Sequence, residues 1–386
     1  MSLNSSEDYF HIYNQQEFYL IETTWNLITI DHPYLNSSNL NAIKNSTGND
    51  INFHYIVFSN EKGENTGVAY FQLLSFDHQH YKSFFRVNSL INWFEKKLIN
   101  NRFNILVCGS LFSIESSGYY FKSGLTLKTA HQFYSATRAL AKRIRASSLL
   151  IKDVPDSDVE FLNSLGLNAY EGDKTMQLAI QNSWNNISDY ENTLKHKYAQ
   201  RFRSIKRKLQ GVLIKELNET DIILNEAKLF SLFESLVEKQ TIRLGRVNSN
   251  YFSELKKAYG ENLKIFGFFK NNILIAFVIH RIHIESKEYE IHFVGFDEIE
   301  NKNHSLYFNI LFHSIEQAIL NKCNSLEMGR TAIEAKYIIG AQPRKINGFF
   351  YFYNPLARWL FNILKNIFLK NTESKVIERH PFKTDF

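Results

Sequence analysis

Hydrophobic residues in the first half of the chain gather in short runs that alternate with amphipathic stretches. Runs rich in β-branched and aromatic residues predict strands at 53–58, 67–76, 104–109, 149–154 and 175–180. Phe133, Leu140 and Ile144 recur at helical spacing among basic residues, which predicts a helix over 129–148. A second helix over 156–166 is predicted to end at a glycine. Strands that alternate with helices indicate an α/β fold.

The second half repeats this order of elements. Helices are predicted at 189–210, 226–242 and 304–321, and strands at 263–269, 273–283, 288–296, 325–329 and 348–354. Asn271 and Asn272, between two β-rich runs, predict a hairpin turn. We therefore expect an α/β fold with mixed sheets in two domains, 1–185 and 186–353, followed by a tail over 354–386.

Composition restricts the classes of protein. The chain has 386 residues, 45 Lys and Arg, 39 Asp and Glu, and a net charge of +6, so an anionic partner is permitted but DNA is not an expected one. Two cysteines cannot build a disulfide framework or a thiolate zinc site, and no metal site is expected. The polar, acidic N-terminus is unlike a signal peptide, and no stretch approaches the ~20 apolar residues of a membrane span. These features predict a cytoplasmic protein.

Two segments carry signs of membrane contact. Residues 354–370 have an amphipathic pattern with Trp359 and no acid, which fits a helix on a membrane surface or one docked on the protein's own core. Residues 195–208 hold seven Lys or Arg and no acid. Such a run is a solvated helix face, a phosphate contact for CoA or tRNA, or a site for anionic lipid. Peripheral contact with the inner membrane is the expectation that the two segments share.

A polar cluster follows the predicted strand 325–329. Arg330, Glu334 and Lys336 come directly after the strand, and Arg344 adds a further cation. Polar side chains just beyond a strand are a common way to build sites in α/β folds. Glu334 and Lys336 would share a face in an extended segment and diverge in a helix. A solvated connection with an ordinary Glu–Lys pair is the alternative.

The same segment carries a family resemblance. Gly-Arg-Thr-Ala-x-Glu-x-Lys at 329–336, followed by Gly-Ala-x-Pro at 340–343, resembles the late motif of the FemAB-like branch of the GNAT-fold N-acyltransferase superfamily. That branch includes peptidoglycan biosynthesis proteins and BioF2-like acetyltransferases. Three further stretches are similar to it, at 106–121, 187–209 and 293–319, although Ser110 replaces the family's usual Asn.

The resemblance implies two tandem GNAT-like domains that transfer an acyl or aminoacyl group to an amine. Donors in the superfamily are acyl-CoA, acyl carrier protein and aminoacyl-tRNA. Bacterial ceramide synthases are related, and the Gly, Glu and Lys of their motif map onto Gly329, Glu334 and Lys336, whereas their His falls at Ala335. The Arg/Gln-x-x-Gly-x-Gly/Ala loop with which conventional GNAT proteins hold the CoA pyrophosphate does not precede either candidate helix.

The chemistry of acyl transfer assigns roles to these candidates. An amine must lose a proton before it attacks an ester or thioester, and the resulting oxyanion needs a donor. Glu334 is the candidate base, with Lys336 and Arg330 as oxyanion partners. His292 alternates with Glu290 on one predicted strand and could face the same site. A strand histidine is otherwise an ordinary core or surface residue.

A phosphate site is expected at the start of the predicted helix 304–321, where unpaired N–H groups and the helix dipole favour anions. Asn303, His304 and Ser305 lie at this start, and Arg344 is the cation assigned to the same ligand. A plain helix cap is the alternative. No tightly bound cofactor is expected, and acyl-CoA or acyl carrier protein would be a co-substrate.

The leading expectation is an N-acyltransferase that moves an acyl group from a thioester to an amine of a lipid or cell-envelope precursor, such as a sphingoid-type amine. One alternative is a Fem-type enzyme that transfers an aminoacyl group from tRNA to a peptidoglycan peptide, with tRNA the less favoured donor. Another is a protein of the same fold that binds a membrane or a partner without catalysis.

Overall fold

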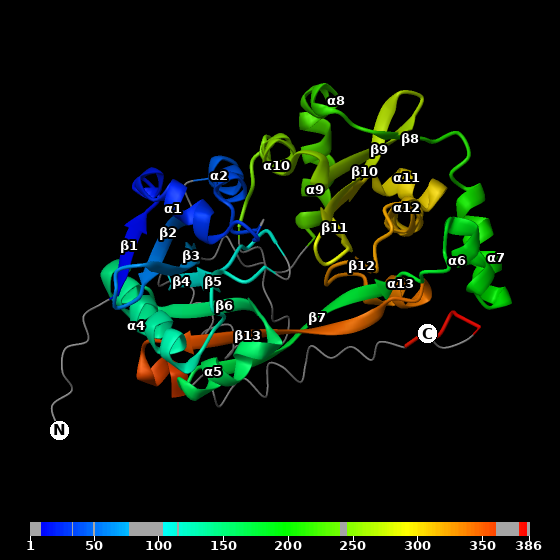
Figure 1. Cartoon of the computed structure of the whole chain (residues 1–386). Helices are drawn as coiled ribbons and strands as arrows, with labels where there is room; N and C mark the ends of the chain where they lie inside the picture. Colours follow the sequence, from blue (N-terminus) through cyan, green and yellow to red (C-terminus); the bar gives the residue numbers. More distant parts are fainter. Residues whose placement is uncertain are drawn as a thin grey trace, which may run out of the picture. The chain divides into compact units, whose positions relative to one another are not determined.

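The computed structural model describes residues 9–32, 34–48, 51–76, 103–113, 116–239, 245–359 and 378–383 (Figure 1). The chain divides into two compact units. Unit 1 comprises Met1–Gly172, Thr241–Val247 and Ile346–Lys370, and unit 2 comprises Asp173–Gln240, Asn248–Lys345 and Asn371–Phe386. The domain boundaries predicted at 185 and 353 stay predictions.

Unit 1 is built on a mixed sheet. Its strands follow the order β1 (Phe10–Asn14), β2 (Ile51–Ser59), β3 (Asn65–Phe76), β4 (Phe103–Cys108), β6 (Ser148–Val154) and the part of β13 (Gln342–Phe352) from Ile346 onwards. β5 (Tyr119–Phe121) pairs with β3. β4 and β6 are parallel, and the chain between them includes α4 (Leu127–Ile144), whose apolar side packs on the sheet through Phe133 and Leu140. Its other helices include α1 (Glu22–Ile28), α2 (Ser37–Asn45) and α5 (Val159–Ser164).

Unit 2 is built on a second set of strands. Their order is the part of β7 (Asn168–Ala179) from Asp173 onwards, β12 (Ser325–Glu327), β11 (Glu288–Phe296), β10 (Ile273–His283), β9 (Leu263–Lys270) and β8 (Leu213–Glu216). β11 and β12 are parallel and the other neighbours are antiparallel. Its helices are α6 (Ile187–Thr193), α7 (His196–Arg207), α8 (Glu219–Leu224), α9 (Glu226–Val237), α10 (Tyr251–Tyr259), α11 (Glu298–His304), α12 (Leu306–Leu320) and α13 (Ile333–Ile338). The predicted α/β class with mixed sheets is confirmed.

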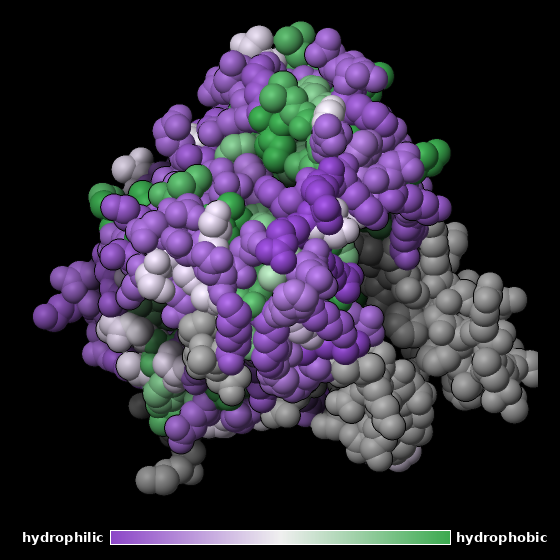
Figure 2. Space-filling view, turned by 90° about the vertical axis from the view of Figure 1, so that its right-hand side faces the viewer, coloured by the Kyte–Doolittle hydropathy of each residue, from purple (hydrophilic) through white to green (hydrophobic). Residues whose placement is uncertain are grey.

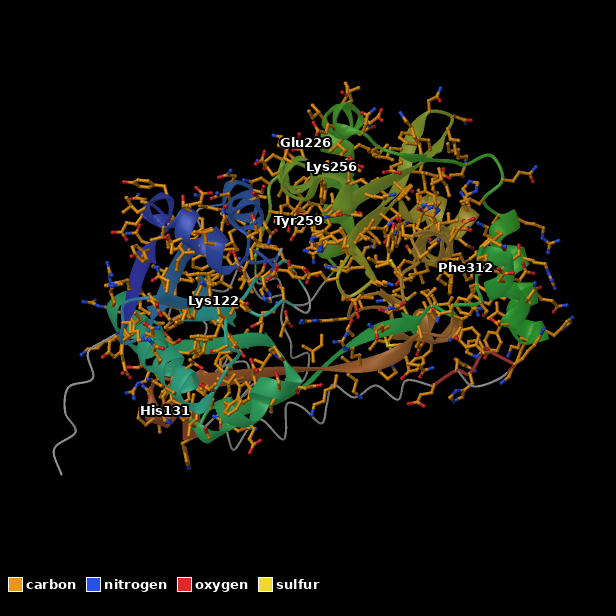
Figure 3. The ribbon with its side chains drawn as sticks, in the orientation of Figure 1. Lys122, His131, Glu226, Lys256, Tyr259 and Phe312 are labelled. Atoms are coloured by element: carbon orange, nitrogen blue, oxygen red, sulfur yellow. The ribbon has the colours of Figure 1, made fainter. Side chains whose placement is uncertain are left out.

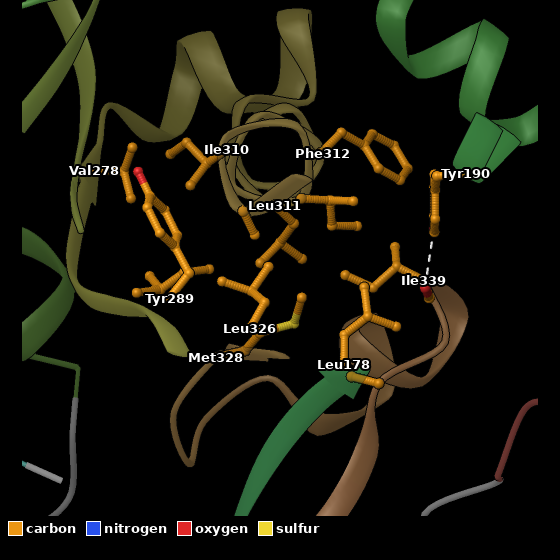
Figure 4. Close-up of a cluster of buried hydrophobic side chains, with 14 of the residues drawn as sticks. Leu178, Tyr190, Val278, Tyr289, Ile310, Leu311, Phe312, Leu326, Met328 and Ile339 are labelled. Carbon is orange, nitrogen blue, oxygen red and sulfur yellow. Dashed lines mark hydrogen bonds between the residues drawn. The ribbon is translucent and has the colours of Figure 1, made fainter. Parts of the chain in front are cut away.

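Helices cover both faces of the unit 2 sheet. On one face, α12, α6 and α7 enclose a hydrophobic core into which the strands contribute Tyr289 and Leu326 (Figure 4). On the other face, the rings of Phe233 from α9 and Phe252 from α10 pack against Phe293 of β11. Tyr289 and Phe293 are four residues apart and would share a face in a regular strand, so their placement on opposite faces shows that the alternation of β11 is interrupted between them.

The predicted hairpin between β9 and β10 is confirmed. Asn271 and Asn272 have φ values of 49° and 62°. Positive φ at both central residues is the signature of a type I′ turn, whose twist matches that of the flanking strands. Asparagine tolerates this conformation better than most residues, which is why the Asn-Asn pair predicts it.

The predicted helix 189–210 is two helices in the structure. α6 ends at Thr193 and α7 begins at His196, because Leu194 adopts an extended backbone with φ −72° and ψ 142°. The backbone N–H of Lys195 donates to the carbonyl oxygen of Pro381 at 2.8 Å, and Leu194 forms a β-bridge with Phe382. A contact with the distant C-terminal segment therefore accompanies the break, and no local glycine or proline marks it.

The predicted helix 304–321 begins two residues later than expected. Ser305 has φ 49° and ψ 45°, which separates α12 from the short helix α11 before it. α11 has its own N-cap, Asp297, whose carboxylate accepts from the N–H groups of Ile299 and Glu300. Residues 303 and 304 thus belong to α11, and only Ser305 occupies the cap position of α12.

The segment after β13 and the face of α6 and α7 are the regions for which membrane contact was predicted. Residues 355–359 are helical, and the rest of the predicted helix 354–370 lies outside the described residues. Trp359 is 60% exposed. No helix in the described parts of the chain is long and apolar enough to cross a membrane. Figure 2 shows that the face on which α6 and α7 lie is mostly hydrophilic, with hydrophobic residues in separate patches.

Candidate functional site

The parallel strands β11 and β12 separate after a short contact. Their register runs from Glu288 opposite Ser325 to Glu290 opposite Glu327, and β12 ends there while β11 continues. The chain after Glu327 stays beside β7, since the N–H of Met328 donates to the carbonyl oxygen of Met176 at 2.8 Å. β11 therefore loses its neighbour on this side just beyond Glu290.

A β-bulge lies at the same point of β11. Its register with β10 shifts so that Ile279 lies opposite Phe293 while His280 lies opposite Ile291, which leaves His292 as the extra residue. Bulges bend a strand and redirect a side chain, and they are common beside active sites. The separation of the strands and the bulge together place His292 where the sheet opens.

Glu290 is the centre of a buried polar cluster. Arg281 holds its carboxylate with two atoms, Nε at 3.0 Å from Oε2 and Nη2 at 2.7 Å from Oε1. His283 Nε2 lies 3.0 Å from Oε2, and His292 Nδ1 lies 3.2 Å from Oε1. Arg281 also donates to the hydroxyl of Tyr259 at 3.3 Å, at the end of α10 (Figure 3).

The charges in this cluster stabilise the ionised carboxylate. Glu290 is 3% and Arg281 1% exposed. Burial alone would raise the pKa of Glu290, but the Arg281 charge and the hydrogen bonds from His283 and His292 hold that pKa well below its usual value. The cluster therefore presents an anchored carboxylate to both histidines.

His292 is held as a neutral base. Burial and the Arg281 charge lower its pKa to about 4, against a smaller opposing effect of Glu290. A neutral imidazole that donates its Nδ1–H to Glu290 keeps a lone pair on Nε2. That Nε2 atom is buried and has no hydrogen-bond partner. An orphaned buried acceptor is costly, and here it points to a ligand that donates to it.

A second buried cluster lies on the neighbouring strand. Glu327 accepts from the hydroxyl of Thr175 and from the N–H of Gly329, the latter at 2.8 Å. Lys336 Nζ donates to the carbonyl oxygen of Gly329 at 3.0 Å, and burial lowers the pKa of Lys336 to about 8, opposed by the Glu327 charge. Because Glu290 and Glu327 are partners in a parallel register, they share one face of the sheet, about 4.8 Å apart across the strands.

The structure separates the candidates predicted after β12. α13 is helical, so Lys336 is buried while Glu334 is exposed. Arg330 is half-buried beside the Gly329 turn, and Arg344 is exposed with Nη1 3.8 Å from the Glu288 carboxylate. Of the predicted catalytic residues, Lys336 joins the Glu327 cluster and His292 the Glu290 cluster. Their catalytic roles stay predictions.

The predicted phosphate site is partly occupied by the chain itself. The N–H of Tyr307 in the first turn of α12 donates to Asn301 Oδ1 at 2.9 Å. His304 Nδ1 lies 2.7 Å from the carbonyl oxygen of Lys208, and its Nε2 lies 3.2 Å from Glu300. Asn303 is exposed, and Ser305 makes no side-chain cap. Phosphate binding by Asn303, His304, Ser305 and Arg344 stays a prediction.

Arg281, His283, Tyr259, Glu327 and Thr175 are site residues that the sequence analysis missed. A signal for the first two was present, since the strand ILIAFVIHRIH ends its apolar run with charged and polar residues. A buried charge in such a strand requires a partner. Glu327 gives a weaker signal as the one acid in the run SLEMG. Within the described residues, no group of three His, Cys, Asp or Glu could hold a metal ion.

Acid is expected to destabilise the fold through its buried histidines. Burial lowers the pKa of His54, His292 and His313 to about 4, against 6.5 for an exposed imidazole. As the pH falls from 6.5 towards 4, the unfolded state takes up protons before the folded state does. Each histidine then removes up to about 3 kcal/mol of stability. Urea unfolding at pH 7.5 and pH 5.0 measures this loss.

His313→Phe provides the control for the acid effect. The ring of His313 packs edge-on against Phe266 with centroids 4.6 Å apart, so a phenyl ring suits the site. The variant is expected to lose less stability between pH 7.5 and pH 5.0 than the native chain. Replacement of the exposed His131 by alanine is expected to leave the loss unchanged. Equal losses in the native chain and His313→Phe would contradict the account.

Comparison with known proteins gives information about the fold. No family model and no curated protein sequence matches the chain. Among solved structures, FemX matches with a TM-score of 0.52 and 12% identity over 89% of this chain and 98% of FemX. A tandem GNAT protein from the clavulanic acid biosynthesis pathway matches with a TM-score of 0.49 and 8% identity over 90% of this chain and 99% of its own. L-PGS from Bacillus licheniformis matches with a TM-score of 0.47 and 10% identity over 86% of this chain and 96% of L-PGS.

The FemX match is the one of these three with a TM-score above 0.5, and at 12% identity it shows the fold and not the activity. The chain therefore has the fold of FemX, which agrees with the motif resemblance to FemAB-like proteins.

Proposed function

We propose that the chain is an N-acyltransferase whose reaction takes place in unit 2, where β11 and β12 separate. The observation that carries the proposal is the buried, unpartnered Nε2 of His292, whose Nδ1 lies 3.2 Å from Glu290. A neutral imidazole held in one tautomer by a carboxylate is the arrangement of a general base. Arg281 acts through Glu290 as a positioning residue.

The proposed step joins an amine to an acyl thioester. The amine nitrogen forms a bond to the carbonyl carbon, and its proton passes to Nε2 of His292. The carbon–sulfur bond of the tetrahedral intermediate then breaks, and the thiolate takes the proton from His292. The products are an amide and a free thiol.

Backbone groups of β11 supply the donors that this chemistry needs. Beyond Glu290, no strand among the described residues pairs with the edge of β11 that faced β12. N–H groups on an open edge can bind an extended amide-bearing donor and stabilise an oxyanion. Lys336 fixes the Gly329 turn that carries the chain away from β11. Its predicted role towards the oxyanion is retained as part of the proposal.

Unit 1 contains a second parallel pair, β4 and β6, that offers no such base. The register of this pair ends with Cys108 opposite Ile151. Lys152 Nζ then donates to the carbonyl oxygens of Ser110 at 2.5 Å and Ser113 at 3.0 Å, which ties the following loop to β6. Burial raises the pKa of Cys108 well above its usual value, so the thiol stays protonated. The described residues at this point include no histidine paired with a carboxylate, and we assign the chemistry to unit 2.

The donor is proposed to be acyl-CoA or acyl carrier protein, and the acceptor an amine of a lipid or cell-envelope precursor. The exposed basic side of α7 and the exposed Trp359 support work at a membrane surface from the cytoplasmic side. The buried side of α7, formed by Ala199, Phe202 and Ile205, packs on the unit 2 core. The basic residues that alternate with these three on α7, such as Arg201 and Arg203, are therefore exposed to solvent.

Fem-type transfer from aminoacyl-tRNA is the second candidate, and the FemX-like fold is the observation that favours it. The bond that forms is the same, since an amine again attacks an activated carbonyl. The leaving group would be a ribose hydroxyl in place of a thiol. The two candidates therefore differ in the donor and share His292.

Thermal unfolding with candidate donors separates the two functions. A ligand that binds only the folded state stabilises it by about 2.7 kcal/mol at a hundredfold excess over Kd. We expect stabilisation by long-chain acyl-CoA, or by acyl carrier protein loaded with an acyl chain, and none by free adenosine. Stabilisation by aminoacyl-tRNA alone would move the proposal to the Fem-type reaction. Stabilisation by no donor at all would contradict both.

A further inference from the structure

Unit 1 carries a groove on the exposed side of α4. Its volume is about 690 Å³, and it is lined by α4 and by Tyr353, just beyond the end of β13. His131, Arg138 and Lys142 line the groove from α4, and Arg145 lines it from the C-cap of that helix; His131 is labelled in Figure 3. A volume of this size is typical of sites for small molecules and cofactors.

The cations of the groove have no acidic partner among the residues that the structure describes. Its lining includes no Asp or Glu, and α4 has none along its whole length. Lys128 at the start of α4 is paired with Glu61 at 2.6 Å, but that pair lies outside the groove. None of the three groove cations, Arg138, Lys142 and Arg145, forms an ion pair with a described residue. Arg138 and Lys142 are four residues apart and lie on one side of α4, and Arg145, the C-cap residue of the helix, lines the same groove.

Aromatic rings form part of the wall. Tyr134 lines the groove, and its ring lies 5.7 Å from the Arg138 guanidinium. Tyr353 stands edge-on to Tyr351 with centroids 5.5 Å apart, and the hydroxyl of Tyr353 is buried with no hydrogen-bond partner. A buried hydroxyl without a partner is uncommon in native structures and points to an unseen one. The groove thus combines a row of cations with a flat apolar wall and a spare donor.

We propose that this groove binds a phosphorylated small molecule with a planar ring, of the size and chemistry of a nucleotide. Arg138, Lys142 and Arg145 would bind its phosphates, and Tyr353 would contact the ring and donate its hydroxyl. A row of cations binds phosphate groups well, because guanidinium and ammonium groups make charge-assisted hydrogen bonds to the phosphate oxygens. Because the cations lie in a groove bordered by aromatic rings, a small ligand can reach them more easily than a flat membrane surface can. This site is separate from the acyl-transfer proposal and does not depend on it.

Direct binding of ADP to the full-length chain tests the site. We expect saturable binding by calorimetry, with pyrophosphate binding more weakly because it lacks the ring. Arg138→Glu with Lys142→Glu is expected to weaken ADP binding by at least about tenfold, as removal of charged hydrogen bonds does. Tyr353→Ala is expected to reduce the preference for ADP over pyrophosphate. Both variants change groove residues, and unfolding curves will confirm that each is folded.

Arg143→Glu is the matched control. Arg143 is exposed on the same helix, carries the same charge and does not line the groove. It is expected to change ADP affinity by less than about twofold, since exposed charges act weakly at a distance. An equal loss in Arg143→Glu would reveal a general charge effect and overturn the site. Absence of saturable ADP binding would overturn it too, as would binding to phosphatidylglycerol vesicles that ADP does not displace.

Discussion

Replacing His292 by asparagine is expected to slow amine acylation by about 10²–10⁴-fold, the usual contribution of a general base. The asparagine amide can donate to Glu290 as the Nδ1–H of His292 does, so the buried carboxylate keeps that partner. It offers no basic atom in place of Nε2, which is the buried and unpartnered atom of the native site. Single-turnover measurements of amide formation would isolate this effect from product release.

His283→Asn is the control for this prediction. His283 contacts the same carboxylate through Nε2 at 3.0 Å, but it lies on β10 and not in the bulge of β11. We expect it to lower the rate far less than His292→Asn. Both variants should bind the acyl donor with the affinity of the native chain. The rise in unfolding temperature on adding the donor measures this affinity. If His292→Asn and His283→Asn slow the reaction equally, Glu290 and its partners have a structural role only.

Replacing Arg281 by methionine is expected to lower the free energy of unfolding by about 3–5 kcal/mol, the cost of breaking a buried ion pair. Arg281 is 1% exposed and contacts Glu290 at 2.7 and 3.0 Å, so its removal leaves a buried carboxylate without its counter-charge. Replacing both residues, as Arg281→Met with Glu290→Gln, is expected to recover part of that loss. Urea unfolding monitored by circular dichroism measures each change.

Arg203→Met is the matched control for the buried pair. Arg203 contacts Glu191 at 2.9 Å, but its side chain is 54% exposed. Exposed pairs contribute about 0–1 kcal/mol, so this variant should be nearly neutral. If Arg281→Met is no more destabilising than Arg203→Met, the Glu290 cluster is not the anchor that we describe.

Local patterns were sufficient to predict the longer strands and the helices α4, α5, α9 and α12, but they did not predict the short strands β1, β5 and β8 or several short helices such as α8, α10 and α13. The hairpin at Asn271 and Asn272 and the end of α5 before Gly166 follow from residues with known turn preferences. The break between α6 and α7 could not be predicted, because it coincides with a bridge from Leu194 to Phe382. The local sequence around Leu194 does not indicate a contact with a residue so far away in the chain.

The candidate site was predictable only in part. The period of two along a strand correctly placed His292 beside Glu290. The same period would put Val294 next on that face, but the bulge puts Phe293 there, against Phe233 of α9. The partner of Glu290 depends on the register between β10 and β11, which a single strand does not reveal. The motif resemblance pointed to Glu334 and Lys336 alike, whereas burial in the structure singles out Lys336 on that helix.

The most direct test of the central claim is the amount of amide that the full-length chain forms from an acyl thioester and an amine, measured by mass spectrometry. The native chain, His292→Asn and Glu334→Gln would be compared under the same conditions. We predict that the native chain and Glu334→Gln form amide at similar rates and that His292→Asn forms almost none. Full activity of His292→Asn together with loss of activity in Glu334→Gln would contradict the account and place the base on α13.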